Sequence, residues 1–563
     1  MCQELIAAQP SMNSSSRSAI ARCLSACMFV GSLAGGPLHA AEAPHPKLIV
    51  TIAVDQFSSD VFTEYRPLYQ AGLKRLAGGV VFPRGHQSHA STETCPGHST
   101  ILTGVRPGRT GIIANDWQDP SHPRTEKGKE TFTLYCVEKP GPAGSSADDK
   151  VISPDTLLVP TLGDRMKARD PATKVVSVSG KDRSAVMLGG HHADLTLWWT
   201  QAGFTTYAGK ESSIPKEIAD EINANVRKSY GQPTVAKLPP ACASRSRSVK
   251  VTDEISIGTL QNLPANSKRW RATPAMDSFT VDAALAAVKS FNLGKNSTDL
   301  LAVSFSGTDY AGHYYGTEGA EMCTQQLALD QSLGRLLAGL DKTGIPYVVA
   351  MTADHGGIDA TERNKQRGVT EAARIESNLL PPNVSAALEK ELPGLPKPIV
   401  LGAREFANDV YLNAAIPTDR REGVLRAAYL YYRNHPQVAA VFTKHELIEA
   451  EQPSGPVDEW TLLDRAKASF NAQRSGDLIV LLKPYISLYQ LPRNVDSDYT
   501  SSHGSAWGYD RRVPLVFWWK GVTGFEQPVA VETVDLAPTL AKIIGLDVPA
   551  GEFDGRALPI VLP

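Results

Sequence analysis

Short apolar segments constrain the fold of this 563-residue chain more strongly than any other feature of its sequence. Their side chains do not alternate between apolar and polar, which is typical of strands buried on both faces of a parallel sheet. Segments with helical patterns lie between them, for example Val281–Val288, Cys323–Leu340 and Leu536–Ile544. This alternation predicts an α/β fold with a mostly parallel central sheet and helices on both faces. The predicted strands are Leu48–Val54, Val175–Ser179, Leu300–Phe305, Tyr347–Thr352 and Val513–Trp518.

Two long stretches, at about 190–270 and about 358–475, have weaker patterning than the rest of the chain. The first is rich in serine, proline and lysine, and no internal repeat is found along the sequence. We therefore expect one domain over residues 42–563, with these two stretches inserted as a cap over a site at one edge of the sheet.

The composition excludes several classes of protein. Charged residues make up 21% of the chain and the formal net charge is −2. Proteins that bind nucleic acids carry a basic excess that neutralises phosphates, so we expect no nucleic-acid-binding surface. The 45 glycines and 39 prolines are too few for a collagen-like or low-complexity chain. No uncharged stretch after the N-terminal region approaches a membrane-spanning length, so we expect no membrane span in the mature chain.

Residues 1–41 have the three parts of a secretory signal peptide. Arg17 and Arg22 form a charged region, Cys23–Gly35 is mostly small and apolar, and Ala40 and Ala41 mark a cleavage site. The apolar part is too short to cross a bilayer. We therefore expect a periplasmic or secreted protein.

Four cysteines remain after removal of this signal peptide: Cys95, Cys136, Cys242 and Cys323. In an oxidising compartment they allow two disulfides with three connectivities, among which the sequence does not choose. The chain has no C-x-x-C pair. A thiol-ligated zinc site or a thioredoxin-type motif therefore has no support.

Polar and charged residues follow four of the predicted strands directly. Asp55 follows the first strand, and Lys181 and Arg183 lie just after the second. The third and fourth strands lead into Thr308–His313 and Asp354–Gly357. Open α/β sheets bind ligands beyond the carboxyl ends of their strands, so these groups predict a site at one rim of the sheet.

Six residues have the chemistry of metal ligands: Asp55, Asp309, His313, Asp354, His355 and His503. Carboxylates and imidazoles without thiolates favour a catalytic divalent site, zinc above all. Asp309 and His313 are four residues apart, so if the segment is helical both point from one face of the helix. Taken singly, Asp55 also suits a helix N-cap, His503 a surface position, and the Asp309/His313 pair an exposed helix face. Together the six are enough for two ions with three protein ligands each.

A nucleophile is predicted at Thr94, in the segment Thr92–His98. A threonine before a proline-containing first turn suits a helix N-cap, and helix N-termini present free N–H groups to anions. Thr94 then either caps the helix and does nothing more, or is also the attacking hydroxyl, activated by a metal.

The order of these motifs resembles the alkaline phosphatase superfamily. The matching positions are Asp55, Thr94–His98, Asn115, Thr308–His313, Ala353–Gly356, His503 and the segment Thr533–Leu540. A threonine nucleophile resembles the branch that holds nucleotide pyrophosphatases/phosphodiesterases and a group of bacterial periplasmic alkaline phosphatases. The resemblance implies an alkaline-phosphatase-like catalytic domain with two zinc ions per chain.

The resemblance also implies roles for single residues. One zinc would be held by Asp309, His313 and His503, and the other by Asp55, Asp354 and His355. Thr94 would bind the second zinc and attack phosphorus, forming a phospho-threonine that is then hydrolysed. The side-chain amide of Asn115 would donate to a phosphoryl oxygen. From the residues alone, Asn115 followed by Asp116 also suits a turn.

Lys181 and Arg183 bear on the choice between monoesters and diesters. A monoester carries more negative charge, so a site that selects it needs additional positive donors. Residues two apart on an extended segment point to the same side, and this pair resembles the phosphate-clamping motif of threonine-type monoesterases. Cys95 and Gly97 stand where many nucleotide pyrophosphatases carry Phe and Asn, which weakens the resemblance to the nucleotide diesterases a little.

We therefore expect an alkaline phosphatase that hydrolyses small-molecule phosphate monoesters and, by resemblance, is a monomer. The alternatives are a phosphodiesterase or nucleotide pyrophosphatase, an enzyme with both activities, and a non-catalytic phosphate- or metal-binding protein. The intact Thr94 beside six ligands argues against the last of these, because binding alone needs no nucleophile.

Overall fold

The computed structural model describes residues 46–560 and residue 562, except residues 121, 143, 149 and 403–407. The predicted signal peptide at 1–41 lies outside these residues. None of the described helices is long and apolar enough to cross a membrane.

A ten-stranded sheet forms the centre of the fold, in the order β21-β2-β20-β13-β1-β12-β7-β8-β9, with β22 paired to β2. Its central strands β13, β1, β12, β7 and β8 run parallel. Leu48 at the start of β1 is in register with Asp299 of β12 and Tyr347 of β13, so these strands end at the same rim. The mostly parallel sheet predicted from the sequence is confirmed. The strands are β1 (Leu48–Val54), β2 (Val80–His86), β7 (Val175–Ser179), β8 (Leu195–Thr200), β9 (Gly203–Thr205), β12 (Asp299–Phe305), β13 (Tyr347–Thr352), β20 (Arg512–Trp519), β21 (Phe525–Glu526) and β22 (Val531–Glu532).

The strand at Val513–Trp518 differs from its prediction in direction. It lies within β20, which is antiparallel to both of its neighbours, β13 and β2. The run is apolar because β20 is buried on both faces, and burial does not distinguish a parallel strand from an antiparallel one. The chain enters β20 through the short helix α16 (Gly508–Arg511).

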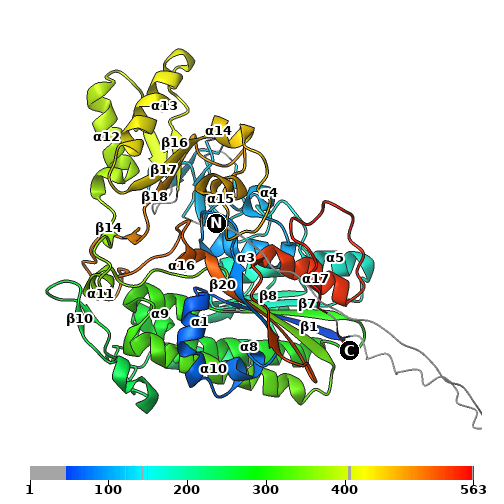
Figure 1. Ribbon diagram of the computed structural model, residues 1–563. Helices are drawn as coiled ribbons and strands as arrows, with labels where there is room; N and C mark the ends of the chain where they lie inside the picture. The colour runs from blue at the N-terminus through cyan, green and yellow to red at the C-terminus, as the bar shows by residue number, and fades with distance from the viewer. Residues whose placement is uncertain are drawn as a thin grey trace, which may run out of the picture. The chain divides into compact units, whose positions relative to one another are not determined.

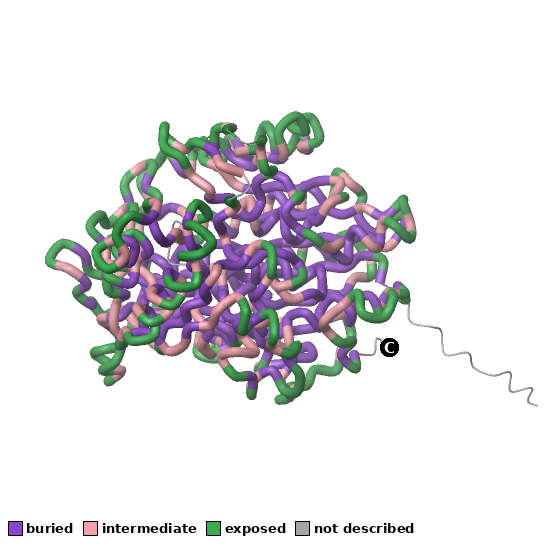
Figure 2. Tube along the Cα trace, turned by 90° about the horizontal axis from the view of Figure 1, so that it is seen from above, coloured by how far each residue is buried: buried purple, intermediate pink, exposed green. Residues whose placement is uncertain are grey.

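Helices cover both faces of the sheet, as the sequence predicted (Figure 1). Val50 and Ile52 of β1 face a core that also contains residues of α1, α2, α8 and α10. Ile49 and Ala53 face the opposite core, with residues of α3, α5, α6 and α17. The buried residues run through the centre of this part of the chain and the exposed ones surround it (Figure 2). The helices are α1 (Ser59–Tyr65), α2 (Gly72–Leu76), α3 (Thr94–Thr103), α5 (Leu162–Arg169), α6 (Asp182–Gly189), α8 (Pro274–Phe291), α10 (Gly319–Asp341) and α17 (Leu536–Ile543).

The stretch at 190–270 contributes to the central sheet rather than lying wholly outside it. Its first part forms β8, which pairs with β7, and β9, which pairs with β8. The remainder contains α7 (Asn223–Tyr230) and the two-stranded ribbon of β10 (Val249–Lys250) and β11 (Ser256–Ile257). Trp198 and Trp199 both lie in the strand β8.

The second stretch contains its own four-stranded sheet, in the order β15-β16-β18-β17. Helices α12 and α13 share a separate apolar core with this sheet. The strand β18 lies beyond residue 475, so the sheet extends past the expected boundary. The elements are α12 (Pro381–Glu391), β15 (Val400–Gly402), β16 (Asp409–Leu412), α13 (Thr418–Arg433), β17 (Val438–Thr443) and β18 (Leu478–Leu482).

This smaller sheet is joined to loops of the main domain by hydrogen bonds. The Asn408 side-chain amide donates to Ser91 Oγ at 3.0 Å and to the Gly504 carbonyl at 3.3 Å. Both acceptors are close in sequence to predicted site residues, Ser91 to Thr94 and Gly504 to His503. The remaining elements are α4 (Pro107–Thr110), β3 (Asp116–Gln118), β4 (Arg124–Glu126), β5 (Lys129–Thr131), β6 (Thr133–Tyr135), α9 (Gly307–Tyr315), α11 (Thr361–Gln366), β14 (Ala373–Arg374), α14 (Lys444–Glu449), α15 (Leu462–Ser469) and β19 (Ile486–Ser487).

Two disulfides link the four cysteines that follow the predicted signal peptide. They join Cys95 to Cys136 and Cys242 to Cys323, which is one of the three connectivities that the sequence left open.

Candidate active site

The carboxyl ends of the parallel strands bring the six predicted metal ligands together. Asp55 follows β1, Asp354 and His355 follow β13, and Asp309 lies in α9, which begins just after β12. The Asp55 amide donates to the Phe305 carbonyl at 2.9 Å, which fixes Asp55 beside the end of β12. All six side chains are buried.

Asp55, Asp354 and His355 form a first trio. One ligand atom from each lies within 4.8 Å of the other two. His355 Nε2 is 3.6 Å from Asp55 Oδ1 and 3.3 Å from Asp354 Oδ2. The trio has the same members as one of the two ligand sets predicted from the sequence.

Asp309 is the centre of a second group. His313 Nε2 lies 3.4 Å and His503 Nε2 lies 3.6 Å from Asp309 Oδ1. Asp309, His503 and His355 also have ligand atoms within 4.8 Å of one another. The ring of His355 stacks on that of His503 with centroids 3.7 Å apart, so His355 lies between the two groups.

Backbone carbonyls fix the orientation of all three histidine rings. The Nδ1 atoms of His313, His355 and His503 lie 3.1, 2.7 and 2.9 Å from the carbonyl oxygens of Ser501, Gly356 and Thr92. A carbonyl only accepts hydrogen bonds, so Nδ1 carries a proton, and in the neutral ring Nε2 then keeps its lone pair. Histidines that bind metals are held in the same way by a partner of the other ring nitrogen.

The electrostatics of these groups fit divalent cations. Burial, together with the carboxylates of Asp309 and Asp354, raises the pKa of Asp55 well above its ordinary value. Burial and the neighbouring rings of His355 and His313 lower the pKa of His503, so its neutral, ligating form prevails. Oδ1 of Asp55, Oδ1 of Asp309 and Nε2 of His355 are buried without a hydrogen bond. Buried lone pairs without donors are costly, and a bound cation removes that cost.

Thr94 is the first residue of α3 and not its N-cap, which corrects the sequence-based prediction. The N-cap is Glu93, in extended conformation, and its side chain makes no capping hydrogen bond. Instead, Asn115 Oδ1 accepts a hydrogen bond from the Cys95 amide at 2.9 Å, which satisfies a donor of the first turn. Because Asn115 supplies the capping oxygen, the Thr94 hydroxyl is not needed for it.

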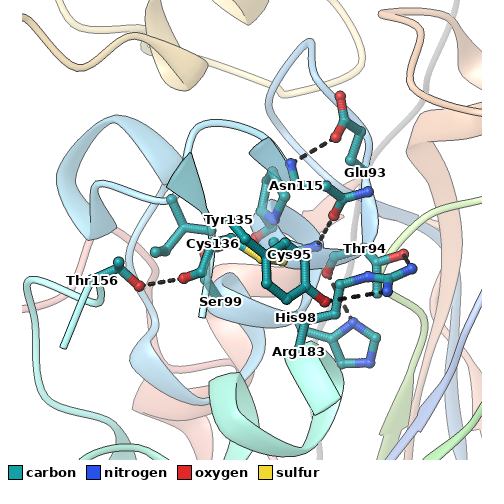
Figure 3. The surroundings of a disulfide bond; sticks show 12 residues. Glu93, Thr94, Cys95, His98, Ser99, Asn115, Tyr135, Cys136, Thr156 and Arg183 are labelled. Atoms are coloured by element: carbon teal, nitrogen blue, oxygen red, sulfur yellow. Dashed lines mark hydrogen bonds between the residues drawn. A yellow bond between two sulfur atoms is a disulfide. The ribbon is translucent and has the colours of Figure 1, made fainter. Parts of the chain in front are cut away.

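Asn115 is held so that its amide group is oriented. Its side-chain oxygen accepts from Cys95, and its backbone N–H donates to Glu93 Oε2 at 2.7 Å (Figure 3). With the oxygen occupied in this way, the side-chain NH₂ group keeps two donors for another acceptor. This geometry favours the donor role over a simple turn.

Lys181 and Arg183 both reach the site, although not from one extended segment. Lys181 is extended and is the N-cap of α6, whereas Arg183 is the second residue of that helix. Lys181 Nζ lies 2.7 Å from Asp55 Oδ2 and 2.5 Å from Asp309 Oδ2. Burial lowers the pKa of Lys181, but these two carboxylates outweigh it and the net shift is upward. Arg183 Nη2 donates to Thr94 Oγ1 at 3.4 Å.

His98 belongs to the quoted Thr94–His98 motif but received no role from the sequence. Its Nδ1 lies 2.9 Å from the Thr94 carbonyl and 3.0 Å from Asp354 Oδ2, and its Nε2 lies 2.8 Å from Ser304 Oγ. It therefore ties the start of α3 to a candidate metal ligand and to β12. Its partners Asp354 and Ser304 lie more than 200 residues away in sequence, so only its place four residues after Thr94 could have pointed to it.

Comparisons with known proteins show the family of this chain. Residues 49–506 match the family described as type I phosphodiesterase / nucleotide pyrophosphatase. The alkaline phosphatase PhoK of Sphingomonas sp is 45% identical over 525 residues, 92% of each chain. The alkaline phosphatase PhoD of Zymomonas mobilis is 44% identical over 519 residues, 91% of this chain and 88% of that protein.

A solved structure shows the same fold. The crystal structure of the wild-type alkaline phosphatase PafA superposes with a TM-score of 0.76 at 26% identity, over 92% of this chain and 99% of that one. PafA is a protein of Elizabethkingia meningoseptica. The chain belongs to the type I phosphodiesterase / nucleotide pyrophosphatase family, as an alkaline-phosphatase-like member.

Proposed function

We propose that this protein hydrolyses phosphate monoesters through attack of Thr94 Oγ1 on phosphorus. The alcohol of the ester leaves, a phospho-threonine forms, and water then releases inorganic phosphate and restores the hydroxyl. The observation that carries this proposal is the placement of Thr94 Oγ1 beside Arg183 Nη2, at 3.4 Å. A hydroxyl next to a fixed guanidinium suits attack on a phosphoryl group, since the guanidinium binds two of its oxygens.

Two zinc ions are part of the proposal. Asp309, His313 and His503 would hold one ion, while Asp55, Asp354 and His355 would hold the other, with Thr94 as a further ligand. When bound, such ions neutralise charge and lower the pKa of a coordinated hydroxyl. The lowered pKa values of His355 and His503, the crowded carboxylates and their buried lone pairs support this assignment.

The chain's own residues would orient the phosphoryl group. The Asn115 amide and the Arg183 guanidinium are the donors for its non-bridging oxygens. Lys181 contributes a buried positive charge next to Asp55 and Asp309. A monoester dianion gains more from these charges than a diester monoanion does.

A second candidate function is the hydrolysis of phosphodiesters, alone or together with monoesters. The observation that favours it is the family match, since the family's description is that of phosphodiesterases and nucleotide pyrophosphatases. The buried cation Lys181 and the half-buried cation Arg183 favour the monoester instead.

We further propose that the protein works as an exported monomer on small-molecule phosphate esters. The two disulfides support an oxidising compartment.

Trapping the intermediate tests the proposed nucleophile. Enzyme mixed with an excess of an aryl phosphate is quenched in acid within one turnover, digested and analysed by mass spectrometry. We expect one phosphate on the peptide that contains Thr94, and none in Thr94→Ala. A phosphate on another residue, or hydrolysis with no labelled peptide at any quench time, would overturn the covalent route.

A further inference from the structure

We infer that the Cys95–Cys136 disulfide and Tyr135 form a positioning unit for the phosphate-binding donors Asn115 and Arg183. None of these three residues touches the reacting atoms; they act through the two donors. The inference rests on the proposed function, because it assumes that Asn115 and Arg183 bind the phosphoryl group.

The backbone amides of both half-cystines donate hydrogen bonds to Asn115, one to its side chain and one to its backbone. The Cys95 amide donates to the Asn115 side-chain oxygen at 2.9 Å, and the Cys136 amide donates to the Asn115 backbone carbonyl at 2.9 Å. Figure 3 shows Asn115 against the disulfide, with the Thr94 side chain close by. Because Cys95 directly follows Thr94, the covalent bond fixes the position of the amide donor relative to the nucleophile.

Tyr135 extends the same unit to Arg183. Its hydroxyl donates to Asp182 Oδ1 at 2.8 Å, and Arg183 Nη1 donates to that hydroxyl at 3.5 Å. Arg183 Nη2 reaches Thr94 Oγ1. Since Tyr135 immediately precedes Cys136, the same disulfide fixes the positions of both phosphate-binding donors, Asn115 and Arg183, relative to Thr94.

The local fold explains why a cross-link is useful here. Tyr135 ends β6, which forms a two-stranded sheet with the three-residue strand β3, and Asp116 lies opposite Tyr135 in that ribbon. An isolated two-stranded ribbon is marginally stable in water. Both cysteines are buried in an apolar cluster with Trp117, and the Cys136 carbonyl accepts a hydrogen bond from Thr156. The disulfide therefore attaches this short ribbon to the helix that carries the nucleophile.

The second disulfide provides a matched control. Cys242 and Cys323 join the segment Pro240–Arg245 to helix α10 and lie in the core on the opposite face of the sheet from α3. Like the first pair, both residues are fully buried. Its removal changes the stability of the fold without changing the contacts of Asn115.

The test is a double-mutant cycle on zinc-loaded enzyme. Cys95→Ala/Cys136→Ala and Cys242→Ala/Cys323→Ala are each made with and without Asn115→Ala. For each variant kcat/KM on an aryl phosphate monoester, zinc content and thermal midpoint are measured. We expect removal of the first disulfide to lower kcat/KM by up to about a hundredfold, the order expected for a misplaced group, with two zinc ions still bound.

The interaction between the substitutions decides the question. In the wild-type background we expect Asn115→Ala to lower kcat/KM by roughly a hundredfold or more. In the Cys95→Ala/Cys136→Ala background the same change has a much smaller effect, whereas in the control background it keeps its full effect. Full additivity in both backgrounds would overturn the positioning role while leaving Asn115 as a phosphate donor. If Asn115→Ala alone changes nothing, the proposed role of Asn115 is wrong.

A second variant keeps the test decisive if the cysteine variants fold poorly. Tyr135→Phe removes only the hydroxyl that Arg183 contacts and leaves the disulfide intact. We expect a raised KM and lowered kcat for the monoester, and a smaller effect when Arg183 is already alanine. If Tyr135→Phe has the same effect in the wild type and in the Arg183→Ala variant, the role assigned to Tyr135 is contradicted.

Discussion

Arg183 Nη2 lies 3.4 Å from Thr94 Oγ1, although the two residues belong to different helices and are 89 positions apart in the sequence. The contact puts a permanent positive charge beside the predicted attacking oxygen. Burial lowers the pKa of Arg183, but the neighbouring Tyr135, Tyr310 and Asp182 outweigh it and the net shift is upward. The guanidinium therefore stays charged at every pH at which the enzyme works.

Replacement of the attacking hydroxyl tests the first half of this relationship. We expect Thr94→Ala to lower kcat by at least about a thousandfold, as loss of a nucleophile does, because no other described hydroxyl occupies its place. Thr94→Ser is the matched control and should retain turnover, since it keeps the oxygen. Bound zinc stays near two per chain in both variants. Turnover by Thr94→Ala close to that of the wild type would remove Thr94 from the mechanism.

Replacement of the charge tests the second half. Arg183→Ala should reduce kcat/KM for an aryl monoester by at least about tenfold more than for the matched diester, because the monoester carries the additional charge that the guanidinium binds. Removal of Lys181 as well should widen this difference. Equal losses on the two substrates would show that neither side chain selects monoesters.

Gly97 allows α3 to approach the turn after β13. A Cβ atom built on Gly97 would lie 2.0 Å from the Asp354 carbonyl oxygen, which is closer than atoms can come. We expect Gly97→Ala to lower the free energy of unfolding by about 2–3 kcal/mol, since overpacking against backbone is not easily relieved. The exposed Gly423 in α13 has open space around it. Gly423→Ala should therefore stabilise by about 0.5–1 kcal/mol.

Urea unfolding of both glycine variants measures these changes. Zinc content is followed in parallel, because a shift at Asp354 moves a candidate ligand. A Gly97→Ala protein as stable as the wild type would contradict the close approach of the two segments.

Asp409 in the smaller sheet predicts a pH dependence of stability. Burial raises its pKa to about 6 from an ordinary value of 3.8, although a hydrogen bond from the Gly476 amide, at 2.7 Å, opposes the shift. Between these two values the folded protein binds more protons at Asp409 than the unfolded chain does. The contribution of Asp409 to the free energy of unfolding is therefore fully present below about pH 4 and is lost as the pH rises through about 6.

Asp409→Asn removes this dependence and keeps an oxygen for the Gly476 amide. The variant should gain stability relative to the wild type as the pH rises from about 4 to 6, by on the order of 2–3 kcal/mol in total. Urea unfolding at several pH values measures the difference. A difference that does not vary over this range would show that Asp409 titrates normally.

The sequence predicted the parallel strands and the rim because both leave local signals. A strand buried on both faces must be apolar throughout. A charged residue close after its end, such as Asp55 or Asp354, is costly to bury unless it binds a partner. The direction of β20 leaves no such signal. The boundary of the smaller sheet was also missed, because β18 lies after the expected end of the insertion.

The features that the sequence did not predict depend on contacts between distant segments. Thr94 had the sequence of an N-cap, but Asn115, 20 residues after Cys95, supplies the capping oxygen. His98 acquires its role only when β12 and the turn after β13 come together. The disulfide pairing likewise follows from the way the ribbon of β3 and β6 packs beside α3.

Substrate preference of the wild-type enzyme is the most direct test of monoester hydrolysis by this site. The value of kcat/KM is measured for an aryl phosphate monoester and for the matched diester, on enzyme of known zinc content. We predict that the monoester is preferred by roughly a hundredfold or more, because Lys181 and Arg183 add positive charge that a diester does not use. Equal values, or a preference for the diester, would place the protein with the phosphodiesterases and leave both cations without a part in selecting the substrate.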